Sequence, residues 1–145
     1  MFKHILLPTD GSPLSEIAIE RGIGLAKTID ARVTGLHVIE PFHLFFGGAE
    51  MMNDTQEQYE KESLVHAQKY LDSLTAAAKQ AGVSCDCVTE KSSHPYEVII
   101  GAAEKRGCDL IVMASHGRRG IRGLLLGSET IKVLTHTKIP VLVLR

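Results

Sequence analysis

The chain has 145 residues, of which 44% are hydrophobic and 23% charged, close to the average of globular proteins. This length predicts a single domain over residues 1–145, and the composition argues against a disordered, collagen-like or coiled-coil chain. Sixteen Lys and Arg side chains against seventeen Asp and Glu leave a net charge of −1. No overall electrostatic field therefore favours nucleic acid or a membrane surface.

The contents of cysteine, aromatic and apolar residues exclude further classes of protein. Three cysteines are too few for a disulfide framework, and 5% aromatic residues without Trp argue against stacking surfaces for single-stranded nucleic acid. No signal-peptide core and no apolar stretch of about 18 residues is present, so we expect a cytoplasmic protein without a membrane span. The charge is uneven, because residues 110–145 carry six Lys and Arg but one acid. This basic end is either an anion site or a solvated face.

In chain order, apolar runs alternate with amphipathic segments. The first run, Ile5 to Leu7, ends in Pro8-Thr9-Asp10-Gly11, after which Ser12 is a predicted N-cap and Pro13 the first helical residue. The predicted strands cover residues 5–7, 33–39, 83–89, 110–114 and 139–144, and the predicted helices cover residues 13–30, 53–81, 95–107 and 128–136.

Several boundaries depend on single residues. Asn53 or Asp54 is the expected cap of the second helix, whose apolar stripe starts at Leu64 and ends at Ala81 before Gly82. Residues 42–52 have no clean period and are predicted to be an apolar loop that packs on the core or on a partner. Ser92 and Ser93 are expected N-caps of the third helix, with contact to a ligand as the alternative.

This alternation predicts an α/β fold: a five-stranded parallel sheet, doubly wound, with strand order 3-2-1-4-5. In such sheets ligands bind at the carboxyl ends of the strands, where the strand order reverses. The segments that follow the strands are therefore the places where a binding site is expected.

The segment after the fourth strand, Ala114 to Ser128, is rich in glycine and carries three arginines before the first acid, Glu129. It leads to a helix start with Ser128 as the expected N-cap, where free amides and the helix dipole favour an anion. These features predict a phosphate cradle, and the alternative is a flexible basic loop. The segment has no G-x-x-x-x-G-K-[ST], and no G-x-G-x-x-G follows the first strand, which argues against a P-loop ATPase or a dehydrogenase.

The same segment resembles the universal stress protein family in its nucleotide-binding branch. That branch carries G-x-x-G, nine residues and G-[ST]; this chain has Ala114-Ser115-His116-Gly117, nine residues and Gly127-Ser128. The opening Leu7-Pro8-Thr9-Asp10-Gly11-Ser12, the segment Leu36-His37-Val38 and the closing Pro140-Val141-Leu142-Val143 are also similar, so the resemblance spans the chain.

The resemblance implies a domain that binds ATP, ADP or AMP, with Mg²⁺ or Mn²⁺ on the phosphates and no metal ligands from the protein. It places Asp10 and Val38 beside ribose and adenine, Met113 at the base, and the loop at the phosphates. The nucleotide-binding residues expected are Pro8, Thr9, Asp10, Val38, Met113, Ala114, Ser115, His116, Gly117, Arg118, Arg119, Gly127, Ser128 and Glu129.

Some of these residues have alternative roles. Alanine replaces the first motif glycine at Ala114, which is harmless at negative φ and strained at positive φ. Asp10 either contacts ribose or caps the turn at Gly11-Ser12. His116 either meets a phosphate with its ring or contributes only its amide. His37 is expected to be a packed residue, not a ligand.

Cys85 and Cys87 alternate along a strand, so both thiols should face one side of the sheet. With Cys108 they are expected to be structural, because no further metal ligands are evident in the sequence.

Three functions remain open: a nucleotide-dependent binding module of the stress response, a slow ATPase or phosphotransfer protein, and a nucleotide-free interaction protein. A fourth, a flavodoxin-like electron carrier, is disfavoured, because the turn at residues 8–12 lacks a hydroxyl-rich FMN loop and aromatic residues are scarce. No catalytic residue is assigned, since Asp10 and His116 are the only candidate bases near the γ-phosphate. The last apolar strand, with Val141, Leu142 and Val143, predicts a homodimer formed by edge pairing.

Overall fold

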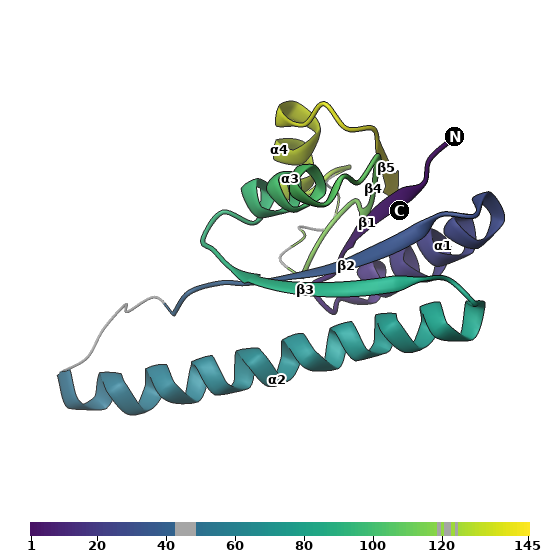
Figure 1. Ribbon diagram of the computed structural model, residues 1–145. Helices are drawn as coiled ribbons and strands as arrows, with labels where there is room; N and C mark the ends of the chain where they lie inside the picture. Colours follow the sequence, from purple (N-terminus) through teal and green to yellow (C-terminus); the bar gives the residue numbers. More distant parts are fainter. Residues whose placement is uncertain (43–48, 119, 121–122, 124) are drawn as a thin grey trace.

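The computed structural model describes residues 1–42, 49–118, 120, 123 and 125–145, with the backbone alone described for residues 49–54. Strands and helices alternate along these residues (Figure 1). The elements are β1 (His4–Pro8), α1 (Pro13–Ile29), β2 (Arg32–Ile39), α2 (Ala49–Ala81), β3 (Cys85–Lys91), α3 (Pro95–Arg106), β4 (Leu110–Ala114), α4 (Ser128–His136) and β5 (Val141–Leu144).

The strands form one parallel sheet in the order β3-β2-β1-β4-β5, which confirms the predicted fold class and strand order. The chain winds outward from β1 through β2 to β3, then crosses to β4 and β5 on the other side of β1. The order thus reverses between β1 and β4. A crevice forms at such a reversal, because the connections on the two sides leave the sheet in opposite directions.

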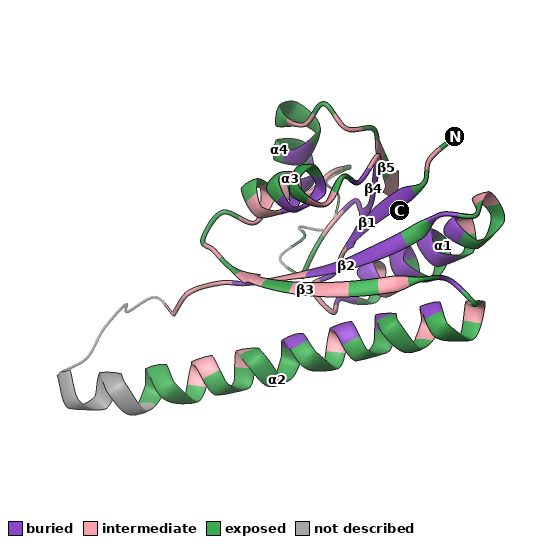
Figure 2. Cartoon of the chain, in the orientation of Figure 1, coloured by how far each residue is buried: buried purple, intermediate pink, exposed green. Residues whose placement is uncertain are grey.

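Two apolar layers cover the sheet, one on each face. On one face, α1 and α2 contribute Ile23 and Leu74 to a buried cluster with β1 and β2. On the other face, Ile99 of α3 and Val133 of α4 pack with β1, β2 and β4. The inner strands are buried along nearly their whole length (Figure 2), as a parallel sheet covered on both sides requires.

Most predicted helix ends are confirmed. The Ser12 side chain accepts a hydrogen bond from the Ser15 amide, and Pro13 follows it as the first residue of α1. Gly107 ends α3 with a φ of 67° and Gly82 follows α2 with a φ of 75°, left-handed conformations that glycine adopts without strain.

Several boundary predictions were wrong. Helix α2 begins at Ala49 and not at Asn53 or Asp54, so the predicted loop 42–52 covers its first turn; Ala, Glu and Met are strong helix formers. The rest of that loop, residues 43–48, lies outside the described residues. Strand β3 starts at Cys85, because the Val83 amide bonds back to the Ala78 carbonyl in the C-cap of α2.

Three further corrections concern caps and the α2 stripe. The N-cap of α4 is Gly127, whose carbonyl accepts the first helical bond from Ile131, so Ser128 is the first helical residue. The N-cap of α3 is His94, without a side-chain cap, so Ser92 and Ser93 do not cap it. Leu64, placed on the buried stripe of α2, is 61% exposed, because the inward face of α2 runs through Ser63, which lines a pocket, and the buried Ala67.

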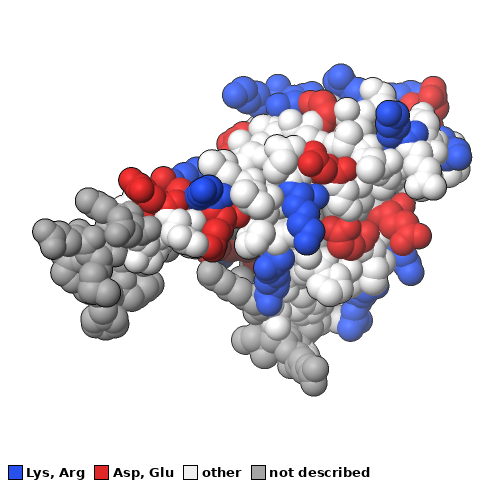
Figure 3. Space-filling view, turned by 90° about the horizontal axis from the view of Figure 1, so that it is seen from below, with Lys and Arg blue, Asp and Glu red and all other residues white. Residues whose placement is uncertain are grey.

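Among the described helices, none is both long and apolar enough to cross a membrane. On the face shown in Figure 3, acidic and basic side chains lie interspersed over the described residues. That face therefore offers no continuous surface of one sign.

Candidate functional site

A cavity of about 590 Å³ opens at the carboxyl ends of β1, β2 and β4, where the strand order reverses. Such a volume lies within the range of small-molecule sites. It brings together twelve of the predicted nucleotide-binding residues: Pro8, Thr9, Asp10, Val38, Met113, Ala114, His116, Gly117, Arg118, Gly127, Ser128 and Glu129.

Two predicted residues stand apart. The Ser115 side chain does not line the cavity: the residue is 1% exposed, its hydroxyl bonds to His116 Nδ1 and its carbonyl accepts from the Gly127 amide. Arg119 lies outside the described residues.

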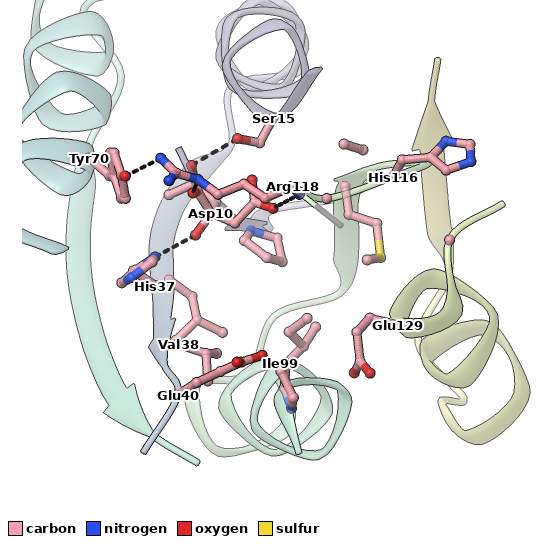
Figure 4. A pocket seen from close by; sticks show the side chains of 18 of the residues that line it. Asp10, Ser15, His37, Val38, Glu40, Tyr70, Ile99, His116, Arg118 and Glu129 are labelled. Atoms are coloured by element: carbon pink, nitrogen blue, oxygen red, sulfur yellow. Dashed lines mark hydrogen bonds between the residues drawn. The ribbon is translucent and has the colours of Figure 1, made fainter. Parts of the chain in front are cut away.

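One end of the cavity is apolar. Val38 of β2, Met113 of β4 and Ile99 of α3 line it, and Pro95 lies at the start of α3 beside them (Figure 4). These side chains belong to or flank the buried cluster on the α3 and α4 face, so their positions are fixed by packing. A flat apolar group of the size of a nucleobase is the kind of ligand that such a slot takes.

Asp10 stands at the centre of the site, directly after β1. One carboxylate oxygen accepts the Ser12 amide at 3.0 Å and the other accepts the Arg118 amide at 2.7 Å. Burial raises the pKa of Asp10, but hydrogen bonds from Ser12 and the Arg118 amide outweigh it and hold the pKa below its usual value. Asp10 thus remains ionised and caps the first turn, which was one of its two predicted roles.

The close approach of Asp10 explains the glycine at position 117. A Cβ at Gly117 would lie 2.5 Å from Asp10 Oδ2, a distance that real contacts do not reach. Ala114, in contrast, tolerates its methyl group, because Asp30 is the sole described residue other than glycine with a positive φ. The alanine in place of the first motif glycine therefore causes no backbone strain.

Arg118 spans the cavity from the loop to helix α2. Its Nε donates to the Asp10 carbonyl at 2.9 Å, a terminal nitrogen donates to the Tyr70 hydroxyl, and its guanidinium carbon lies 5.2 Å from the Tyr70 ring centroid (Figure 4). A cation is thereby held over the polar half of the cavity by an aromatic face.

Several backbone amides of the loop after β4 already have hydrogen-bond acceptors within the chain, which the sequence did not predict. Those of Arg118, Gly120 and Gly127 already bond to Asp10, Gly117 and Ser115 respectively. These three amides are therefore not free donors for the predicted phosphate cradle. The first turn of α4 remains a source of donors, because the first amides of a helix have no intrahelical acceptor.

The His116 ring turns away from Asp10 and Arg118 (Figure 4). Its Nδ1 bonds to the Ser115 hydroxyl at 3.0 Å, and its Nε2 is buried without a partner among the described residues. Of the two predicted roles, the contribution of a backbone amide is the one that this orientation favours.

Glu129 lines the cavity, but its carboxylate forms a hydrogen bond with the N-terminus of helix α3. One oxygen accepts the Tyr96 backbone amide at 2.9 Å and the other pairs with Lys132 at 3.0 Å. Glu129 therefore caps the N-terminus of α3 from α4 and joins the two helices that flank the site.

Sequence reasoning missed one whole wall of the cavity. Tyr59, Ser63, His66 and Tyr70 of α2 line it, and His37 of β2 lies edge-on to Tyr70 with ring centroids 5.3 Å apart. The four α2 residues are spaced by four, three and four positions, the period of a helix face, and this spacing could have revealed them. His37 is packed as predicted, with Nδ1 2.8 Å from the Thr9 carbonyl oxygen, yet it also lines the cavity.

Among the described residues, no group of three or more His, Cys, Asp or Glu side chains could hold a metal ion. The site therefore combines an apolar slot, an ionised carboxylate, a clamped guanidinium and a helix N-terminus. This combination, at the switch point of a parallel sheet, is chemically suited to an anionic ligand with an apolar end.

Comparison with known proteins assigns the family. The universal stress protein family matches residues 1–145, and the chain belongs to this family. Universal stress protein MJ0531 of Methanocaldococcus jannaschii is 33% identical over 150 residues, which cover 100% of this chain and 83% of that protein.

Two solved structures agree with the fold. The structure of MJ0577, from the same organism, superimposes with a TM-score of 0.82 at 28% identity and covers 99% of this chain and 96% of that one. The universal stress protein of Archaeoglobus fulgidus in complex with dAMP has a TM-score of 0.70 at 16% identity, with coverage of 100% and 98%.

Proposed function

We propose that this chain binds an adenine nucleotide in the cavity and acts as a nucleotide-dependent binding module of the stress response. The observation that carries the proposal is the combination of chemistry in one cavity. An apolar slot at Val38, Ile99 and Met113, the Asp10 carboxylate, the Arg118 guanidinium and the first turn of α4 line the same space. A nucleotide joins an apolar base, a ribose with hydroxyls and anionic phosphates in one molecule.

Each part of the ligand has a matching group. The slot receives the base, Asp10 accepts hydrogen bonds from ribose hydroxyls, and Arg118 and the amides at Ser128 face the phosphates. The dAMP complex of the relative in Archaeoglobus fulgidus supports the choice of an adenine nucleotide. A divalent cation such as Mg²⁺ or Mn²⁺ would be bound by phosphate oxygens, because the described residues offer no cluster of protein ligands.

The first experiment identifies the ligand. Purified protein is denatured and the released small molecule is analysed, and we expect ATP, ADP or AMP. ADP together with measurable turnover would favour a slow ATPase. Protein that is empty and also binds no added Mg-ATP at millimolar concentration would overturn the proposal.

The second experiment tests the site with two alanine variants. Gly117→Ala puts a methyl group against Asp10 Oδ2 and displaces the phosphate loop, so we expect the affinity for Mg-ATP by calorimetry to fall at least about tenfold, or about 1.4 kcal/mol. Gly101→Ala on the exposed side of α3, where a Cβ meets nothing within 4 Å, is the matched control and should bind as the wild type does. Equal affinities of the two variants for Mg-ATP would show that the nucleotide does not bind beside Gly117.

A further inference from the structure

Strand β3 carries two thiols that the nucleotide site does not use. Cys85 and Cys87 lie two positions apart on this edge strand, both half-buried, and both pack against the apolar cluster on the α1 and α2 face of the sheet. The prediction that they share one face is thus confirmed. In Figure 1, β3 runs beside α2.

The Cys87 sulfur fills a space left by a glycine on β2 and has a polar neighbour on α2. The β2 residue opposite Cys87 is Gly35, and a Cβ there would lie 3.0 Å from Cys87 Sγ, so the sulfur occupies the space that a side chain would fill. On the α2 side, the Thr75 hydroxyl lies 3.3 Å from Cys87 Sγ. The Cys85 thiol donates to the Asp86 carbonyl, with its sulfur 3.6 Å from that oxygen.

The backbone between the two thiols is anchored on the opposite face of the sheet. Asp86 accepts the Thr34 hydroxyl at 2.7 Å and forms an ion pair with Arg106 of α3. These contacts fix the strand between Cys85 and Cys87, so the two thiols are held side by side in the absence of any ligand.

We propose that Cys85 and Cys87 form a two-coordinate site for a soft monovalent cation, Cu(I) or a chemically similar d¹⁰ ion. Thiolates are the ligands that such ions prefer, and two sulfurs suffice for a linear centre. The site is separate from the nucleotide cavity, since neither cysteine lines it.

The strand spacing favours a metal over a disulfide. Residues two apart on a strand lie about 6.6 Å apart, with side chains that stand nearly parallel. A disulfide requires Cβ atoms about 3.5–4.5 Å apart, which this spacing resists. Two metal–sulfur bonds of about 2.3 Å need sulfurs about 4.6 Å apart, which parallel side chains reach by a small inclination.

Binding releases protons and is balanced in charge. Cu⁺ forms one bond to each sulfur, and every proton that the two sulfurs hold leaves to solvent, which gives a bis-thiolate centre of net charge −1. No oxidant or reductant takes part.

The test is an anaerobic titration of the full chain with Cu(I), in competition with a chromophoric Cu(I) chelator. We expect one equivalent to be withdrawn from the chelator by the wild type, and the affinity to fall at least about tenfold in Cys85→Ser and in Cys87→Ser. Cys108→Ser is the matched control, because Cys108 is buried in the cluster on the other face of the sheet. Retention in both single variants, loss in the control, or no withdrawal by the wild type would overturn the proposal.

A second measurement on the wild type needs no variant. Bound Cu(I) should protect Cys85 and Cys87, but not Cys108, from alkylation under mild denaturation, as read by peptide mass spectrometry. Equal protection of all three cysteines, or of none, would also overturn the proposal.

Discussion

At the scale of single residues, His4 shows how burial selects a protonation state. Thr34 donates its hydroxyl hydrogen to Asp86 at 2.7 Å and therefore accepts from His4 Nε2, also at 2.7 Å. The other ring nitrogen, Nδ1, is buried without a partner among the described residues. Burial penalises the charged imidazolium more than its neighbours stabilise it, so the folded chain favours neutral His4.

This arrangement predicts a pH-dependent stability. Burial first, and then the charge of Arg32, lower the pKa of His4 from 6.5. The unfolded chain therefore binds a proton that the folded chain rejects. The contribution of His4 is complete above pH 6.5 and is lost as the pH falls from there toward its folded pKa, by at most about 1.4 kcal/mol per pH unit.

Urea unfolding of the wild type and of His4→Gln between pH 5 and pH 7.5 measures this effect. Gln cannot titrate, so the difference in unfolding free energy between the two proteins should shrink as the pH falls. His94→Gln, a change at an exposed histidine, should leave the wild-type pH profile unchanged. A constant difference across the range would show that His4 does not titrate on unfolding.

At the scale of elements, helix α3 takes its cap from another helix. Its own N-cap residue, His94, makes no side-chain cap, and the Glu129 carboxylate of α4 accepts the Tyr96 amide instead. A cap that comes from 33 positions away leaves no local trace in the sequence. It also ties the helix beside the apolar slot to the helix whose N-terminus faces the polar end of the cavity.

Removal of this contact should destabilise the chain. For Glu129→Ala we expect a loss of about 1 kcal/mol in unfolding free energy, the usual cost of a lost helix cap. Glu129→Gln keeps an acceptor oxygen and should lose less. Glu104→Ala on the exposed face of α3 is the control and should stay within about 0.5 kcal/mol of the wild type. Equal losses in the Ala and Gln variants would show that the hydrogen bond is not the source of the effect.

At the scale of the whole molecule, the sheet was predictable from the sequence because β1, β4 and β5 are short apolar runs and β2 is rich in β-branched residues, each with a turn or helix cap beside it. The positions of the apolar slot and of the Asp10 turn could also be predicted, because both lie at strand ends that meet at one edge of the sheet. The α2 wall was missed, because its helical spacing marks one face of α2 but not the element that this face meets: Tyr70 lies over Gly11, where a Cβ would lie 2.2 Å from the ring. Such a contact depends on how two distant elements pack.

The same sheet leaves β5 as an edge strand, hydrogen bonded to β4 on one side. The carbonyl of Pro140 accepts a hydrogen bond from the Ile111 amide of β4, and that of Leu144 accepts one from the Ser115 amide just after β4. Because backbone groups alternate in direction along a strand, those of Val141 and Val143 point to the open edge. Exposed apolar side chains flank this end of the chain: Ile131 is 50%, Leu134 41% and Leu142 40% exposed.

These features predict that two copies pair through β5, antiparallel across a two-fold axis, in a dimer at micromolar concentration. Val143→Pro removes an outward amide without removing a bond to β4, and an edge strand tolerates proline at such a position. We expect this variant to stay folded by circular dichroism and to be a monomer by light scattering. Val143→Thr keeps the amide and should remain a dimer, whereas a monomeric wild type, or a dimer that survives the proline, would rule out pairing through this edge.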